Sequence, residues 1–142
     1  MSLNELYQSR LLEHNRAPLH RHEMADATHR ARGLDALCGD DLSIWLRVGD
    51  GRIEAASWTG ETCVVTTASA SMLSDWLIGR SREELAAAMD SFTELLESED
   101  QSPRPELGPF NALAAVGRFP SRVRNALLPW KTALAALDSG AM

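Results

Sequence analysis

Apolar side chains recur at helical spacing at the start of the chain and alternate at strand spacing after it. A first helix is predicted to end near His14, because apolar side chains recur along one face: Leu3, Leu6, Tyr7, Leu11 and Leu12. Pro18 and the polar stretch His20–Arg32 predict a long loop. A strand with one buried face follows, with the alternating residues Leu42, Ile44, Leu46 and Val48. Gly49-Asp50-Gly51 is a turn, so Arg52–Trp58 is expected to return as the second strand of a hairpin.

The next part of the chain predicts two helices and a loop. Thr66–Ile78 has a helical pattern and stops at Gly79. Ser81-Arg82-Glu83-Glu84 is a capping box that opens a second helix. The apolar stripe of that helix is Leu85, Met89, Phe92 and Leu96. Glu97–Pro105 is acidic and contains two prolines, which predicts a loop.

The C-terminal region predicts two more helices. A short helix at Pro109–Val116 ends at Gly117, and Ser121 is expected to cap the last helix. The buried side of the last helix is Val123, Leu127, Trp130, Leu134 and Leu137. Pro129 should bend this helix or interrupt its hydrogen bonds. The order of elements predicts an α+β domain, in which a small antiparallel sheet packs against several helices. The four tryptophans are expected in core or half-buried positions: Trp45, Trp58, Trp76 and Trp130.

Length and charge exclude several classes of protein. A chain of 142 residues can bury a core and fits a single domain over residues 1–142. The net charge of −6 argues against nucleic-acid binding, which needs a concentrated basic face. No apolar run approaches the ~20 residues of a membrane span. The start of the chain, Met1-Ser2-Leu3-Asn4-Glu5, carries no visible secretory signal, so we expect a cytoplasmic protein.

Cys38 and Cys63 carry the most distinctive chemistry. In a cytoplasmic chain, two cysteines favour metal binding or thiol chemistry over a disulfide, and two unrelated buried cysteines are the simplest alternative. Gly39 permits a tight turn, so Cys38 and Asp40 can point at the same spot. Cys63 precedes the predicted helix at Thr66–Ile78, where free N–H groups and the helix dipole favour a thiolate.

These residue types suit more than one cofactor. Two thiolates and a carboxylate suit Zn²⁺, which typically takes four ligands. They also partly suit an iron–sulfur cluster, which is usually held by four cysteines. The cysteines do not form Cys-x-x-Cys pairs, so their spacing alone is a weak signal. His20 and His22 form a His-x-His pair, for which loop decoration is favoured over metal binding.

Short motifs over nearly the whole chain point to one family. In order they are Leu6-Tyr7 with Leu11, His14 and Pro18; Cys38-Gly39-Asp40; Gly60 to Cys63 followed by Ala68 to Met72; Gly79; the long stretch from Ser81 to Gly117; and Phe119 to Arg124 followed by Ala126 to Trp130. Together they resemble the U-type iron–sulfur cluster assembly scaffolds, SufU, IscU and the N-terminal domain of NifU. The long stretch makes the resemblance greatest to the SufU branch.

The resemblance implies an α+β scaffold fold and a metal site at Cys38, Asp40, Cys63 and the position of Asn125. In that family the site binds zinc or an assembling cluster, and a cysteine accepts sulfur from a cysteine desulfurase, here expected to be of the SufS type. The implied function is an iron–sulfur cluster assembly accessory or scaffold-like protein. It would be a carrier rather than an enzyme, with Cys38 or Cys63 as the sulfur acceptor.

Asn125 stands where the family has its third cysteine. A neutral amide oxygen is a poor ligand for a soft metal compared with a thiolate. Metal affinity is therefore expected to fall by orders of magnitude, unless a water, a nearby histidine or a partner side chain completes the shell. Other departures from the family pattern are Asp35-Ala36-Leu37, Thr62, Thr66 and Thr67.

Two classes of function therefore stay open. One is a sulfur acceptor that also binds zinc or iron weakly through Cys38, Asp40 and Cys63. The other is a metal-free homologue that only docks to an assembly partner and regulates it. An independent enzyme on the same fold is disfavoured, because the sequence offers no acid/base pair or nucleophile set.

Overall fold

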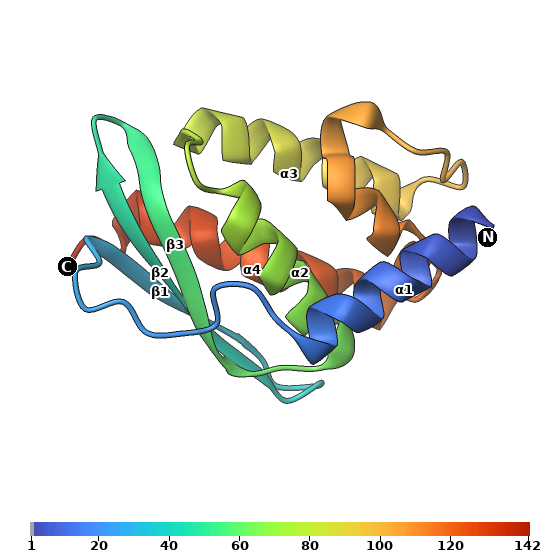
Figure 1. Cartoon of the computed structure of the whole chain (residues 1–142), viewed down its shortest axis with the longest axis horizontal. Helices are drawn as coiled ribbons and strands as arrows, with labels where there is room; N and C mark the ends of the chain where they lie inside the picture. The colour runs from blue at the N-terminus through green and yellow to red at the C-terminus, as the bar shows by residue number, and fades with distance from the viewer. Residues whose placement is uncertain (1) are drawn as a thin grey trace.

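A three-stranded antiparallel sheet and a layer of helices make up the computed structural model of this protein, which describes residues 2–142 (Figure 1). The elements in chain order are α1 (Leu3–Arg16), β1 (His29–Asp35), β2 (Asp40–Gly49), β3 (Arg52–Glu61), α2 (Val64–Trp76), α3 (Arg82–Glu97), the 3₁₀ segment η1 (Pro105–Arg118) and α4 (Pro120–Ser139). The strand order is β1-β2-β3, and the helices lie to one side of the sheet in Figure 1. The predicted α+β architecture is confirmed.

The register of the sheet decides which side chains of β2 face the helices. Side chains alternate between the two faces of a strand, so Asp40 shares a face with Leu42, Ile44 and Leu46. These three apolar side chains are at most 1% exposed, and Asp40 is 2% exposed. The first residue of β2 therefore places a carboxylate on the buried face of the sheet, opposite Asp35 at the end of β1.

Helix α2 is the central helix of the layer. Every residue from Val65 to Ser74 is buried, so the helix has no solvated face over this stretch. Its small side chains allow α4 to approach closely, and Ser69 Oγ donates to the backbone carbonyl of Ala126 at 2.6 Å. Helix α4 also packs against β1 and β2. A Cβ at Gly33 of β1 would overlap the Thr132 side chain of α4, which explains the glycine at this close approach.

An aromatic cluster fills the core between α2, α3, η1 and α4. The Trp130 ring centroid lies 4.9 Å from that of Phe92, 4.6 Å from that of Phe110 and 6.0 Å from that of Trp76. Buried aromatic rings dominate core energetics through their large apolar area. All four tryptophans occupy buried or half-buried positions, as predicted: Trp45, Trp58, Trp76 and Trp130.

Helix α1 is attached to this core by one edge. None of its residues is buried, and Leu3, Leu6 and Leu12 are exposed.

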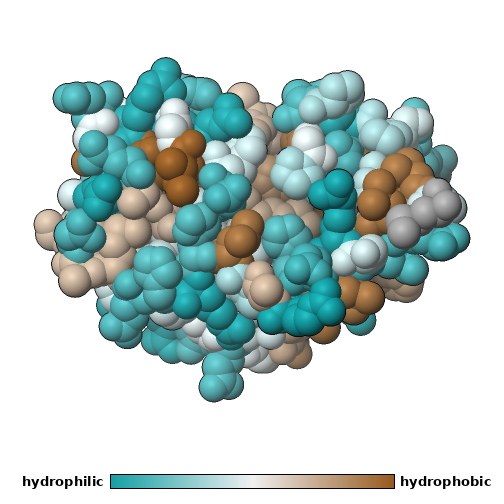
Figure 2. All heavy atoms as spheres, in the orientation of Figure 1, coloured by the Kyte–Doolittle hydropathy of each residue, from teal (hydrophilic) through white to brown (hydrophobic). Residues whose placement is uncertain are grey.

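Figure 2 shows a mostly hydrophilic face on which hydrophobic side chains are scattered in small groups. Within residues 2–142, no helix is both long and apolar enough to cross a membrane.

Strand β1 corrects the prediction of a loop over His20–Arg32. The strand occupies His29–Asp35, so the sheet has three strands rather than a hairpin alone. Only Gly33 is buried among its residues. The apolar alternation that predicts a strand is therefore missing. Backbone pairing with β2 and the cover of α4 hold this strand in place.

The last helix corrects a second prediction. Its N-cap is Phe119 rather than Ser121, and no side chain caps it. Pro120 is the first helical residue, where a missing N–H costs nothing. Pro129 lies inside the helix without ending it, and its predicted effect on hydrogen bonding falls on the carbonyl of Asn125, four residues earlier.

Other predicted boundaries shift by a few residues. Ser81 caps α3 as predicted, because its hydroxyl accepts the backbone N–H of Glu84 at 3.2 Å. The predicted short helix at Pro109–Val116 is part of the longer segment η1, which Gly108 interrupts with φ 47° and ψ −120°. That backbone conformation suits glycine, which has no Cβ.

We expect Trp130→Ala to lower the free energy of unfolding by ~3–5 kcal/mol, because it removes a fully buried ring and leaves a cavity. Urea denaturation followed by circular dichroism measures the loss. Trp45→Ala is the matched control, since that ring is only half-buried and lies 4.4 Å from the Arg30 guanidinium, a contact worth ~0.5–1 kcal/mol at an exposed site. Equal losses in the two variants would contradict the position of the core.

His14 is expected to make stability depend on pH. Its Nδ1 atom lies 2.7 Å from Ser71 Oγ, and burial lowers the pKa of the imidazole below its usual value of 6.5. The unfolded chain then binds a proton more readily than the folded protein, so this contribution to stability is present above pH 6.5 and is lost as the pH falls below it. His14→Gln should therefore lose less stability than the wild type between pH ~7.5 and ~5.5 in urea denaturation. The control His22→Gln changes an exposed ring and should retain the wild-type loss.

Candidate functional site

The carboxylate of Asp40 accepts hydrogen bonds from two helices. Its Oδ1 atom accepts the backbone N–H of Cys63 at 2.7 Å. Its Oδ2 atom accepts the Thr66 hydroxyl at 2.6 Å and the Asn125 side-chain amide at 2.7 Å. The Cys63 thiol lies 3.7 Å from the same oxygen. Because an ionised carboxylate has about four lone-pair sites, these donors satisfy a buried group that would otherwise be costly.

Cys63 is the N-cap of α2, which confirms its predicted place at a helix start. The backbone N–H groups there have no partner within the helix. Thr66, the third helical residue, brings its hydroxyl to 3.2 Å from Cys63 Sγ. The geometry is related to a capping box, in which the third helical residue reaches back to the cap. Asp40 then takes the backbone N–H of the cap itself.

Cys38 lies in the turn between β1 and β2 and is exposed. The Asp35 carboxylate accepts the backbone N–H of Cys38 at 3.4 Å, and its other oxygen lies 3.5 Å from Arg124 Nε of α4. Gly39 follows with φ of 73°, a left-handed conformation that glycine adopts without strain. These contacts hold the turn against α4, so that Cys38 Sγ lies 3.6 Å from Asn125 Oδ1.

Asn125 joins the exposed turn to the buried carboxylate. It is 3% exposed, its Nδ2 atom donates to Asp40, and its Oδ1 atom accepts from the Cys38 thiol. Its backbone carbonyl has no helical donor, because Pro129 lacks an N–H. The Thr66 hydroxyl lies 3.4 Å from that carbonyl oxygen, close enough to share its proton there as well. The proline in α4 thus opens a backbone acceptor that faces α2.

All four positions singled out in the sequence belong to one hydrogen-bonded network: Cys38, Asp40, Cys63 and Asn125. The turn that carries Cys38 and the start of α2 lie at the lower end of the sheet in Figure 1. Sequence reasoning did not assign two further members, Asp35 and Thr66. A local signal exists for each of them. Asp35 lies three residues before Cys38, where an aspartate can form an Asx turn, and Thr66 places a hydroxyl at the third position of a helix.

The donor set of this network falls short of a four-coordinate metal site. Two thiols and the Asp40 carboxylate are present, and Asn125 supplies only an amide oxygen, a poor ligand for a soft metal. Both Asp40 oxygens already accept from protein donors. Within residues 2–142, no three His, Cys, Asp or Glu side chains are grouped so that they could hold one metal ion. The ligand set implied by the family stays a prediction, and the residues as arranged here do not fit a resident zinc ion.

Within residues 2–142, no histidine is grouped with the cysteines and Asp40 so that together they could hold a metal ion. Each ring has a hydrogen-bond partner elsewhere: His14 with Ser71, His20 with Asp75, His22 with Glu23 and His29 with Thr28. A fourth ligand would therefore have to come from solvent or from another protein.

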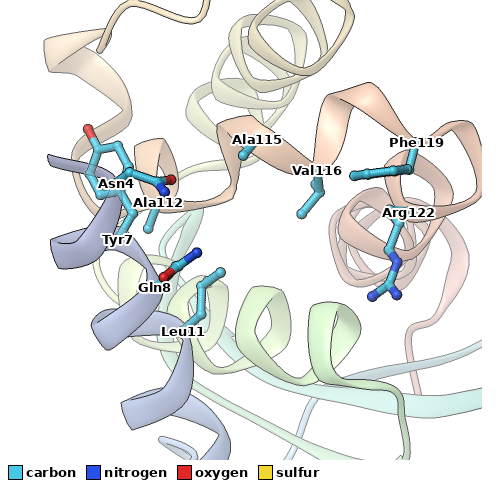
Figure 3. Close-up of a pocket in the computed structure, with 9 residues that line it drawn as sticks. All are labelled: Asn4, Tyr7, Gln8, Leu11, Ala112, Ala115, Val116, Phe119 and Arg122. Carbon is cyan, nitrogen blue, oxygen red and sulfur yellow. The ribbon is translucent and has the colours of Figure 1, made fainter. Parts of the chain in front are cut away.

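An apolar cavity of about 280 Å³ lies between α1 and η1, apart from the cysteines (Figure 3). Leu11 of α1 and Val116 of η1 line it, and Arg122 of α4 lies at its edge. Neither cysteine lines the cavity, and neither Asp40 nor Asn125 does. The two thiols therefore lie outside this apolar cavity.

A family model and a sequence relative both show which family this chain belongs to. The family model described as NifU-like N terminal domain matches residues 6–126. The iron–sulfur cluster assembly scaffold protein IscU of Streptococcus pyogenes serotype M1 is 32% identical over 98% of this chain and 87% of its own length. The zinc-dependent sulfurtransferase SufU of Bacillus subtilis (strain 168) is 27% identical over 98% of this chain and 91% of its own.

A solved structure supports the fold independently of these sequence matches. SufU from the thermophile Fervidobacterium islandicum AW-1 superposes with a TM-score of 0.85, over 96% of this chain and 100% of the other, at 22% identity. The likeness at this identity shows the fold alone. The match of residues 6–126 to the family model and the 32% identity to IscU confirm the resemblance inferred from the motifs: the protein belongs to the NifU-like N-terminal domain family.

Proposed function

We propose that residues 1–142 form a single cytoplasmic domain that acts in iron–sulfur cluster assembly as a sulfur acceptor for a cysteine desulfurase of the SufS type. Membership of the family and the similarity to an IscU scaffold support the assembly role. The similarity to a SufU sulfurtransferase supports the transfer of sulfur. The observation that carries the proposal is the exposed Cys38 thiol, which Asn125 holds at the rim of a buried polar network.

Cys38 is better placed than Cys63 to accept sulfur. Its side chain is exposed in a turn, and among residues 2–142 its thiol has one hydrogen-bond partner, Asn125. Cys63 is half-buried, and its thiol lies between the Asp40 carboxylate and the Thr66 hydroxyl. A partner protein that carries a persulfide on a flexible segment can reach Cys38 without opening the fold.

The transfer step is an exchange between thiol and persulfide that needs no oxidant. The Cys38 thiolate attacks the outer sulfur of the persulfide on the desulfurase cysteine. A bond forms between Cys38 Sγ and that sulfur, the donor's sulfur–sulfur bond breaks, and the donor cysteine leaves as a thiolate. The leaving thiolate takes up the proton that Cys38 lost. In the resting protein the Asn125 amide oxygen accepts the Cys38 S–H and so holds the thiol at the surface turn.

Asp40 and Cys63 help to position the site but do not react in this step. Asp40 fixes both the start of α2 and the Asn125 side chain, which sets the position of the amide oxygen that meets Cys38. The sequence also predicts weak binding of zinc or iron by Cys38, Asp40 and Cys63. That binding would require Asp40 to release protein donors, whereas sulfur acceptance does not depend on it.

Incubation of the wild-type protein with a cysteine desulfurase and cysteine is expected to add the mass of one sulfur atom. Cys38→Ser should abolish the adduct, because it removes the exposed nucleophile, and Cys63→Ser should retain it. Mass spectrometry of the intact protein without reductant measures both results, and peptide mapping locates the sulfur.

A sample treated with dithiothreitol is the control, because reduction of a persulfide removes the added sulfur. A persulfide on Cys63 alone would reassign the acceptor. If neither cysteine gains sulfur while the desulfurase is turning over, the acceptor function is wrong.

Docking without sulfur transfer is the second candidate function, and the side chains beside the cysteines favour it. Leu37 is 85% exposed next to Cys38, and Val64 is 56% exposed next to Cys63. Each of these exposed apolar side chains offers contact area for another protein beside a cysteine.

The double variant Cys38→Ser, Cys63→Ser separates the two functions. We expect it to bind the desulfurase with unchanged affinity, because Leu37 and Val64 remain, and to lose its effect on desulfurase turnover, because the acceptor thiol is gone. Calorimetry measures the binding, and sulfide release in the presence of a reductant measures the turnover. Full retention of the effect on turnover would favour the docking function.

A further inference from the structure

We propose that Asn125 does the structural work of a metal ion at this site, so that the fold and the two thiols are independent of zinc. In a metal-bound site, the ion ties a surface turn, a strand and two helices through bonds to their side chains. Here the Asn125 amide makes those connections itself, with its nitrogen on Asp40 and its oxygen on the Cys38 thiol. The inference concerns the site of the proposed function and rests on it only for the role of the thiols.

The buried Asp40 carboxylate is compensated by hydrogen bonds from the protein. Three protein donors lie within 2.7 Å of its carboxylate oxygens: the Cys63 N–H, the Thr66 hydroxyl and the Asn125 amide. A buried carboxylate at 2% exposure needs compensation from a cation or from hydrogen bonds, and these bonds supply it. The charge of Asp40 therefore has its partners without a metal ion.

Thr66 and Pro129 complete the polar environment of Asn125. Pro129 frees the Asn125 backbone carbonyl, and the Thr66 hydroxyl lies near both that carbonyl oxygen and Asp40. Asn125 thus has polar partners for its carbonyl, its amide nitrogen and its amide oxygen, although it is 3% exposed.

The described residues offer no replacement for the missing metal ligand. Within residues 2–142, no histidine joins the two cysteines and Asp40 in a group that could hold a metal ion, and the Asp35 carboxylate is engaged with the turn of Cys38 and with Arg124. The described residues therefore offer two thiols and one carboxylate that already accepts three hydrogen bonds. That set favours hydrogen bonding within the protein over four-coordinate zinc.

Zinc binding and thermal stability test the inference on the full-length protein. We expect wild-type protein purified without chelator or affinity tag to hold no stoichiometric zinc, and its Tm to be unchanged by EDTA or by added ZnCl₂. Asn125→Cys restores a soft ligand at the position and should tighten zinc binding by more than ~100-fold, since even an outer-shell partner of a metal is worth ~10–100-fold in affinity. Its Tm should rise with ZnCl₂ and fall with EDTA.

Ser121→Cys is the matched control, because it adds an exposed thiol to the same helix one turn before Asn125. It should bind zinc no more tightly than the wild type. Asn125→Ala should lower the Tm in the absence of any metal, since it removes a donor from Asp40.

Stoichiometric zinc in the wild type, or a loss of its Tm on addition of EDTA, would overturn the inference. So would Asn125→Cys binding zinc no better than Ser121→Cys. Should Asn125→Cys fail to fold, the response of the wild type to EDTA decides the question by itself. Persulfide formation is read separately by mass, so a zinc-binding wild type refutes this inference without touching sulfur acceptance, and a missing persulfide refutes sulfur acceptance without touching this inference.

Discussion

The buried carboxylate of Asp40 is the interaction on which the rest of this site depends. Strand alternation places the side chain on the core face of β2, where solvent cannot satisfy it. The protein then has to bring donors to it, and they come from the start of α2 and from α4. A buried carboxylate with directional partners fixes the relative positions of these elements more tightly than apolar contacts alone. The reason is that a hydrogen bond weakens steeply when the donor and acceptor move apart or lose their alignment.

The same constraint explains a proline inside a helix. Pro129 removes one backbone hydrogen bond from α4, which in most helix interiors is destabilising. Here the freed carbonyl belongs to Asn125 and lies near the Thr66 hydroxyl of α2. The freed carbonyl thus faces a polar side chain of a second helix, although the hydroxyl proton is shared with the closer Asp40 carboxylate. Trp130 follows directly in the chain and anchors this part of α4 in the aromatic core.

The sulfur acceptance proposed for this protein and metal binding make different demands on the site. A metal site needs a full set of ligands, so one amide in place of a thiolate weakens it out of proportion to a single substitution. A sulfur acceptor needs one accessible thiol and a partner that delivers sulfur. Cys38 meets the first requirement because its turn is exposed while Asp35 and Asn125 hold it in position.

The sequence by itself determined the elements whose signals are local. The alternation of Leu42, Ile44 and Leu46 predicted β2, Ser81 predicted the start of α3, and Cys63 was correctly placed at the start of α2. The family motifs also identified four positions that the fold brings together. These inferences succeeded because periodicity and capping depend on residues within a few positions of one another.

Only the tertiary structure decided how those positions are connected. β1 has almost no apolar alternation, because an edge strand is held by backbone pairing and by α4 rather than by buried side chains of its own. The roles of Thr66 and Asp35 depend on Asn125 and Arg124, which lie far away in the sequence. Whether Asn125 leaves a gap or closes a network depends on which donors surround Asp40, and local sequence carries no information about that geometry.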